Sequence, residues 1–353
     1  MSRSLARDAT LSFELEPLAP FLEDPAATEI CVNGPGAAFV LAGGLWREEP
    51  CPGLTPGRLS DLANAAAVYA GRPFGSLSPL LSMTLPGGER AQFAGPPAAP
   101  EGRLYVTIRR PADRVRTVDE FLREGFFDAP GPGRQEDPGE LARLFSRAAG
   151  GGPEAPAARA AFLKLAVALQ KNIVIAGETG SGKTTFMKAL MQEIPASERI
   201  LTIEDVPELR AGLPRHRNQV NLFYPPEARD GDPLSAGRLL RAALRMKPDR
   251  ILIAELRGAE TYEFLNACLT GHGGSITSCH AGGCEEAREY LLLKVLQSEA
   301  GSRLTESAIR RLIGLTVDVI VHVSARGPGR RADELWYRGA AGNAGNSKQG
   351  ASS

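Results

Sequence analysis

The sequence predicts an α/β protein with two domains, in which an N-terminal α+β domain precedes a domain with a mostly parallel sheet. Short apolar runs separated by Gly and Pro fill the first hundred or so residues, as is typical of strands in an α+β domain. After residue 157, short apolar strands alternate with helical segments, the pattern of a parallel sheet covered on both faces. A chain of 353 residues with 43% apolar content can bury one or two such cores.

In the N-terminal domain, residues 1–129, three apolar runs indicate strands. They are Ile30–Val32, Phe39–Leu41 and Leu104–Ile108, and a helix is expected over Arg58–Ala70. From Pro130 the composition changes to P-G-P-G-R-Q-E-D-P-G and then G-G-G-P-E-A-P, on either side of a short helical patch at residues 140–148. We therefore interpret residues 130–157 as a linker.

The second domain is expected over residues 158–338. Its strands are predicted at Ile173–Ala176, Ile200–Ile203, Ile251–Ala254 and Val317–Val323. Residues 339–353 are mostly Gly, Ala, Ser and Asn with little to bury, which predicts a disordered tail.

Charge and composition bear on whether the protein binds nucleic acid, spans a membrane or forms disulfides. Lys plus Arg equals Asp plus Glu at 41 each, so the whole chain provides no strong nucleic-acid signal. The N-terminal segment is mixed rather than apolar, and no stretch approaches the roughly 18 apolar residues of a membrane span, so we expect a cytoplasmic protein. Five cysteines, an odd number in a chain of this size, indicate reduced thiols.

A phosphate-binding loop follows the first strand of the second domain. Gly177 to Thr184 reads G-E-T-G-S-G-K-T, between an apolar strand and a predicted helix. Glycines let the backbone N–H groups and the helix dipole face an anion, which predicts ATP as the ligand. The nucleotide-binding residues are expected to be Gly177, Glu178, Thr179, Gly180, Ser181, Gly182, Lys183, Thr184 and Thr185. Lys183 would sit on the β- and γ-phosphates, and Thr184 would ligate Mg²⁺.

Carboxylates follow two further strands at the edge where ligands bind in open α/β sheets. Ile200–Ile203 runs into Glu204 and Asp205, and Ile251–Ala254 runs into Glu255. An ATPase needs such groups to hold Mg²⁺ and to orient the attacking water. Glu204 and Glu255 are therefore the predicted metal-binding and catalytic carboxylates, together with Thr184 for the metal, and the residues leave open which glutamate is the base.

Four stretches resemble the hexameric traffic ATPases of bacterial secretion, and most closely those of type IV secretion and conjugation systems. They are the phosphate loop, the acidic box T-I-E-D-V-P-E-L from Thr202, the segment R-M-K-P-D-R-I-L-I-A-E-L-R-G from Arg245, and G-H-G-G-S-I-T-S-C-H-A from Gly271. Glu29-Ile30, Asn33-Gly34 and the R-R-P at Arg109 extend the likeness to the N-terminal domain.

The resemblance implies a homo-hexameric ring with a RecA-like C-terminal domain and the nucleotide between the two domains. It also implies other secretion-system subunits as partners at the inner membrane, with peripheral contact at its cytoplasmic face. By position, His280, and with less support His272, would sense the γ-phosphate, and Arg109 would reach it from the N-terminal domain. The family further suggests Arg90, Arg241 and Arg245 as cations near the site, although a solvated basic helix face is the alternative for the last two.

Other readings remain open at this stage. Cys268, His272, Cys279, His280 and Cys284 cluster within seventeen residues, but without a C-x₂-C pair zinc is disfavoured. A type II secretion or type IV pilus motor is the nearest functional alternative. A RecA-like helicase is the alternative from another class, and 6% aromatic residues with zero net charge argue against the stacking platform and positive groove it needs. The third alternative function is a nucleotide-gated scaffold that does not hydrolyse ATP at a meaningful rate.

Overall fold

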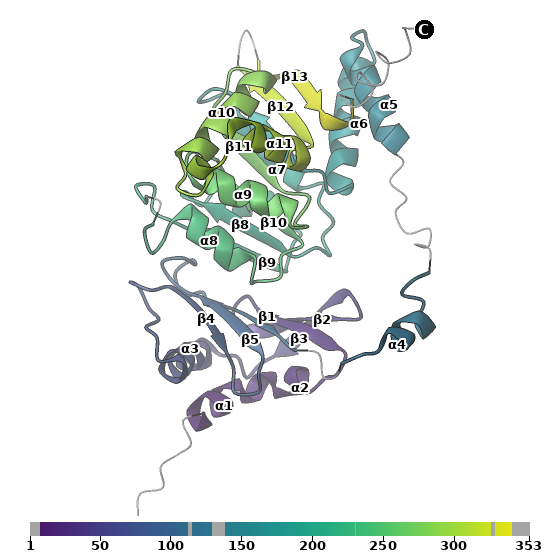
Figure 1. The fold of residues 1–353 in the computed structure, drawn as a ribbon. Helices are drawn as coiled ribbons and strands as arrows, with labels where there is room; N and C mark the ends of the chain where they lie inside the picture. Colours follow the sequence, from purple (N-terminus) through teal and green to yellow (C-terminus); the bar gives the residue numbers. More distant parts are fainter. Residues whose placement is uncertain (1–7, 112–114, 129–137, 230, 326–328, 341–353) are drawn as a thin grey trace, which may run out of the picture.

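The computed structural model describes residues 8–111, 115–128, 138–229, 231–325 and 329–340. It contains two sheets, one in each half of the chain, stacked one above the other in Figure 1. The strand–helix alternation predicted for the second half and the α+β character of the first are both confirmed. Among these residues, none of the helices has the length and apolar character required to cross a bilayer.

The N-terminal domain is an antiparallel sheet of six strands in the order β3-β2-β1-β6-β5-β4. The strands are β1 (Ala27–Val32), β2 (Gly36–Ala42), β3 (Leu45–Cys51), β4 (Leu80–Thr84), β5 (Arg90–Ala94) and β6 (Tyr105–Arg109). Helices α1 (Ala9–Leu15), α2 (Ala19–Leu22) and α3 (Pro56–Ala70) accompany the sheet, and α1 and α3 share its apolar core. Thr55 caps α3 by accepting a hydrogen bond from the Arg58 N–H, and Gly71 ends it in the left-handed conformation.

The C-terminal domain is a seven-stranded sheet in the order β13-β12-β7-β11-β10-β8-β9, parallel except for β13. Its strands are β7 (Ile173–Ala176), β8 (Ile200–Glu204), β9 (Gln219–Phe223), β10 (Arg250–Ile253), β11 (Ile276–Cys279), β12 (Val319–Ser324) and β13 (Arg331–Tyr337). Its helices are α5 (Pro138–Ala149), α6 (Ala155–Ala168), α7 (Lys183–Met191), α8 (Ala236–Ala243), α9 (Glu260–Leu269), α10 (Cys284–Gln297) and α11 (Glu306–Thr316).

Helices cover both faces of this sheet, because its central strands are apolar on both sides. Along β7, Ile173 and Ile175 pack with α5, α6 and α7, whereas Val174 and Ala176 belong to the core formed with α8 to α11. The strand is buried throughout. Successive side chains of β7 therefore lie in two different cores, which explains why its sequence is a continuous apolar run.

The predicted linker is too long. Helix α5 lies within residues 130–157, yet Leu141 is 1% exposed in the core of the C-terminal domain. Phe145 packs against Phe162 and Tyr337, with ring centroids 5.7 and 5.6 Å away. The helical patch was identified correctly, but its apolar face belongs to the second domain. Of the predicted tail, residues 341–353 lie outside the described residues.

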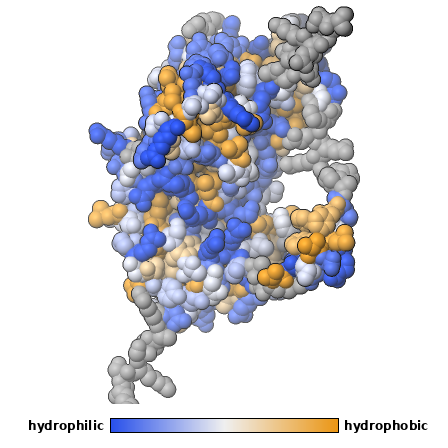
Figure 2. Space-filling view, viewed as in Figure 1, coloured by the Kyte–Doolittle hydropathy of each residue, from blue (hydrophilic) through white to orange (hydrophobic). Residues whose placement is uncertain are grey.

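Before α5, helix α4 (Val118–Arg123) stands apart from both sheets in Figure 1. Thr117 and Glu120 form a capping box at its start. Apolar side chains remain exposed on and around it, and Figure 2 shows them gathered on the surface at this place. They belong to Val115, Val118, Leu122, Phe126 and Phe127.

The two domains contact each other through buried polar groups. Arg199, at the start of β8, is fully buried, and its guanidinium donates to Asn33 Oδ1 at 2.9 Å and to Thr107 Oγ1 at 3.3 Å in the N-terminal domain. Trp46 Nε1 donates to Asp249 Oδ2 at 2.9 Å. Leaving such buried donors unpaired costs free energy, so these contacts favour one placement of the domains.

Candidate nucleotide site

The phosphate-binding loop lies between β7 and α7, as the sequence predicts. Gly182 has φ +96°, a left-handed conformation that glycine adopts without strain. A Cβ at Gly177 would lie 2.3 Å from the Val323 carbonyl oxygen of neighbouring β12. Both glycines are therefore needed for the loop to turn tightly into the N-terminus of α7, where free backbone N–H groups favour an anion.

Lys183 begins α7 and is held inside the loop. Its Nζ donates to the carbonyl oxygens of Gly177 at 2.9 Å and Glu178 at 3.1 Å. Burial lowers the pKa of this ammonium, and the nearby Glu255 carboxylate opposes the shift. An ammonium held by two carbonyl oxygens at the N-terminus of a helix is suited to a phosphate oxygen.

Glu255 and His280 follow neighbouring strands β10 and β11 and meet at the same edge of the sheet. His280 Nε2 lies 2.7 Å from Glu255 Oε1, and His280 Nδ1 lies 3.4 Å from Lys183 Nζ. Nδ1 thus faces the ammonium and Nε2 faces the carboxylate, but the Nε2–Oε1 approach lacks hydrogen-bond alignment, since Glu255 Oε1 has no hydrogen-bond partner among the described residues. The sequence-predicted Lys183, Glu255 and His280 are thus brought together.

These groups line one pocket of about 410 Å³. Of the nine predicted nucleotide-binding residues, Thr179, Gly180, Gly182, Lys183, Thr184 and Thr185 line it directly. Gly177 and Glu178 contribute through the carbonyls that hold Lys183, and Ser181 lies buried beneath, where its hydroxyl has no hydrogen-bond partner in the described part of the chain.

Glu204 does not lie where the sequence prediction put it. It is fully buried, and its Oε2 accepts hydrogen bonds from the backbone N–H groups of Glu208 at 2.7 Å and Leu209 at 2.8 Å. Burial raises the pKa of this carboxyl. In this geometry the side chain fastens the loop after β8 and does not line the phosphate pocket, so its metal-binding and catalytic role stays a prediction. The next residue, Asp205, lines the pocket instead.

Arg109 is also placed away from the phosphate pocket. It ends β6, its side chain is 70% exposed, and its Nε lies 3.6 Å from Glu29 Oε1. With Arg90 and Arg245 it lines a different pocket, of about 380 Å³. Within one chain the described lining of the phosphate pocket comes from the C-terminal domain alone, and the expected position of the nucleotide between the domains stays a prediction.

Two further predicted positions fall outside the pocket. Arg241 pairs with Glu263 on the surface, at 2.6 Å. His272 precedes β11 whereas His280 follows it, so the two histidines lie at opposite ends of that strand. In the part of the chain that the structure describes, no group of three or more Cys, His, Asp or Glu side chains is arranged to hold a metal ion.

Sequence reasoning missed two cations of the pocket, Arg257 and Arg330. Arg257 contacts Glu255 Oε2 at 2.7 Å and pairs with Asp205, so it ties two carboxylates together. Its position two residues after the predicted catalytic Glu255 could have identified Arg257 as a pocket residue from the sequence. Arg330 packs against Gly182 from a segment that is remote in sequence, and no local pattern marks it.

The oxygen donors suit a hard divalent cation. Thr184, Asp205 and Glu255 all line the pocket beside the phosphate loop. Hydroxyl and carboxylate oxygens are the ligands that Mg²⁺ prefers, and one or two of them with phosphate oxygens commonly complete its shell. The residues present therefore fit Mg²⁺ bound together with a nucleotide.

Comparisons with known proteins agree with this site. The family model described as Type II/IV secretion system protein matches residues 152–320. The type IV secretion system protein VirB11 of Brucella abortus is 48% identical over 340 residues, covering 95% of this chain and 91% of that protein. PtlH of Bordetella pertussis, also a type IV secretion system protein, is 43% identical, covering 94% and 96%.

A solved structure extends the likeness to the fold. The VirB11 ATPase of Brucella suis, crystallised in complex with sulphate, superposes with a TM-score of 0.86 at 46% identity and covers 96% of this chain and 97% of that one. The family expected from the four motifs is therefore confirmed over nearly the whole length. The chain belongs to the VirB11 family of type IV secretion ATPases.

Proposed function

We propose that this chain binds ATP with Mg²⁺ in the pocket at the start of α7 and hydrolyses it to drive a type IV secretion system. The observation that supports the site most directly is the convergence of Lys183, Glu255 and His280 on one phosphate loop. A cation for the phosphates, a carboxylate for the water and an imidazole between them form a set suited to phosphoryl transfer.

Each side chain has a role that follows from its position. The loop amides and Lys183 would bind the β- and γ-phosphates, and Lys183 would exchange its carbonyl partners for phosphate oxygens. Glu255, with one oxygen facing His280 and the other Arg257, would orient the attacking water and accept its proton. His280 would respond to the γ-phosphate because its ring touches both Lys183 and Glu255.

Mg²⁺ would be held by Thr184, Asp205 and Glu255, and when bound it would neutralise charge on the phosphate oxygens. Glu204 contributes indirectly, by fixing the loop that presents Asp205. Arg257 would reduce the electrostatic repulsion between the Asp205 and Glu255 carboxylates, because its guanidinium pairs with both. This arrangement places the two proposed metal-binding carboxylates after the adjacent strands β8 and β10, and Thr184 in the first turn of α7.

We further propose that the working form is a homo-hexamer, with other secretion-system subunits as its partners at the cytoplasmic face of the inner membrane. Membership of the VirB11 family supports this assembly and this location.

Phosphate release from ATP by the full chain tests the activity, with Mg²⁺, with EDTA, and with and without single-stranded DNA. We expect hydrolysis that requires Mg²⁺ and does not require DNA. Negligible hydrolysis under all conditions would favour a nucleotide-gated scaffold, and strict dependence on DNA would favour a helicase. Light scattering of the protein with Mg²⁺ and ATP tests the assembly, for which six copies per particle is the expected result.

A further inference from the structure

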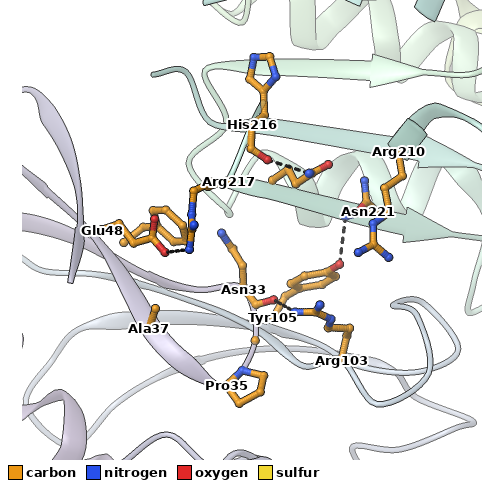
Figure 3. Close-up of a pocket in the computed structure, with 13 residues that line it drawn as sticks. Asn33, Pro35, Ala37, Glu48, Arg103, Tyr105, Arg210, His216, Arg217 and Asn221 are labelled. Atoms are coloured by element: carbon orange, nitrogen blue, oxygen red, sulfur yellow. Dashed lines mark hydrogen bonds and ion pairs between the residues drawn. The ribbon is translucent and has the colours of Figure 1, made fainter. Parts of the chain in front are cut away.

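A pocket of about 250 Å³ lies between the two domains (Figure 3). One wall comes from the β1–β2 turn, β2, β3 and the start of β6, and the other from residues 210–221 of the ATPase domain. None of these residues lines the phosphate pocket described above. The volume is smaller than a typical drug-sized site, so it suits a compact ligand.

Positive charge dominates the lining. Three arginines, Arg103, Arg210 and Arg217, face the pocket with one carboxylate, Glu48. Arg217 Nη2 lies 2.6 Å from Glu48 Oε1, so these two charges largely offset each other. Among the described residues, Arg103 donates only to the Asn33 carbonyl oxygen, at 3.3 Å, and Arg210 has no ion pair and no side-chain hydrogen bond. Within the described part of the chain, neither guanidinium has a counter-charge.

The two guanidiniums come from different domains and line the same pocket. In Figure 3, Arg103 of the N-terminal domain and Arg210 of the ATPase domain both lie near Tyr105. Tyr105 Oη accepts the Asn221 N–H at 3.3 Å, which leaves its own O–H free to donate. Guanidiniums and a phenol O–H are all hydrogen-bond donors, and an oxyanion accepts from such a set.

The backbone is shaped to bring Arg103 to this place. Gly34 in the β1–β2 turn has φ +152°, and a Cβ there would lie 2.3 Å from Arg103 Nη1. A larger residue at position 34 would therefore require the Arg103 guanidinium to shift and would be strained by the backbone conformation.

We propose that this interdomain pocket binds a small phosphate-bearing anion, bridged between Arg103 of the N-terminal domain and Arg210 of the ATPase domain. Like charges brought together from two domains repel, and an anion between them replaces that repulsion with two charge-assisted contacts. The forked guanidinium geometry favours a phosphate over a spherical anion. This site is distinct from the proposed ATP site and does not depend on hydrolysis there.

Binding there would stabilise the observed placement of the domains, because the ligand would contact both. The segment of residues 205–210, which carries Arg210, also reaches the phosphate pocket, since Asp205 and Glu208 line it. The two pockets are therefore joined by one short stretch of chain whose middle is fastened by Glu204.

Calorimetric titration of pyrophosphate into the full-length Lys183→Ala protein tests the proposal, because that substitution disables the phosphate loop. We expect one saturable site, weakened about tenfold or more by adding Arg103→Ala or Arg210→Ala, as expected for the loss of a charge-assisted contact. The matched control is Arg215→Ala, which removes an exposed guanidinium from the same segment but bonds only to the Gln192 carbonyl oxygen. Circular dichroism melting establishes that each variant is folded.

Absence of saturable binding in Lys183→Ala protein would overturn the proposal. So would equal affinities for the Arg210→Ala and Arg215→Ala proteins, since the bound anion would then lie elsewhere. Hydrolysis of ATP by the otherwise unmodified protein is measured separately, so failure of the ATP site and failure of the interdomain site are distinguishable.

Discussion

His280 Nε2 lies 2.7 Å from Glu255 Oε1, across the ends of the adjacent parallel strands β11 and β10. The contact joins the third and fourth sequence motifs, and the Nδ1 side of the same ring joins them to Lys183 of the first. A single imidazole thus connects the phosphate-binding cation to the carboxylate proposed to orient water.

We predict that Lys183→Ala abolishes ATP hydrolysis. Its ammonium sits within the loop itself, and no other Lys side chain lines the described pocket. Steady-state phosphate release measures the effect. Lys188→Ala, on the same helix but outside the pocket, serves as the control and should hydrolyse ATP normally. Near-normal turnover by Lys183→Ala would contradict the nucleotide site.

We predict that Glu255→Gln lowers turnover by roughly 10²-fold or more while nucleotide affinity is largely retained, because the amide cannot accept the proton of the water. Single-turnover hydrolysis and fluorescent-nucleotide binding separate the two effects. Glu263→Gln, which removes a surface carboxylate paired with Arg241, is the matched control. Equal rates for the two variants would mean that Glu255 is not the base.

We predict different outcomes for the neighbours Glu204 and Asp205. Glu204→Gln should lower the melting temperature, because the buried carboxylate oxygen accepts two backbone N–H groups that an amide satisfies less well. Asp205→Asn should lower turnover with little change in melting, since Asp205 lines the pocket. The reverse pattern, with Glu204→Gln stable but inactive, would support the role first expected for Glu204.

We predict that His280→Ala lowers turnover without unfolding the protein, since this side chain is partly exposed in the pocket. His216→Ala provides the contrast, because that ring is buried and its Nε2 lies 3.1 Å from the Pro195 carbonyl oxygen. Melting temperature and hydrolysis are measured for both. A loss of stability at His280 matching the loss of activity would indicate a structural histidine.

We predict a pH-dependent contribution to stability from Glu29 at the start of the N-terminal sheet. Burial raises its pKa to about 7, although Arg109 and Lys247 nearby act in the opposite direction. A raised carboxyl pKa means that the folded state holds the proton more tightly, so this contribution is complete below the usual carboxyl range and is lost as the pH rises through about 7.

Urea unfolding at about pH 5 and about pH 8 measures this contribution. The free energy of unfolding should decline less between these values in Glu29→Gln than in the unsubstituted protein, because the amide does not titrate. An identical pH dependence in the two proteins would show that Glu29 has an ordinary pKa.

The sequence by itself determined the family, the P-loop domain and the strands that carry the site motifs. Strand β7 was predicted with its observed bounds, because a short apolar run ending at a glycine loop is a local signal. Lys183 and Glu255 could be selected for the same reason, since each ends or follows such a loop or strand, whereas the role of His280 came from the family resemblance. Helix α5 was recognised but assigned to a linker, because only packing against Phe162 and Tyr337 shows which domain it joins.

The tertiary structure decided which side chains face the nucleotide pocket. Glu204 and Asp205 are adjacent in a strand end, where successive side chains point in opposite directions, and sequence alone gives no preference between them. Arg330 reaches the phosphate loop, and Arg109 does not, because the domains and the β12–β13 hairpin are placed by contacts distant in sequence. Arg103 and Arg210 likewise line one interdomain pocket only because the two domains pack against each other.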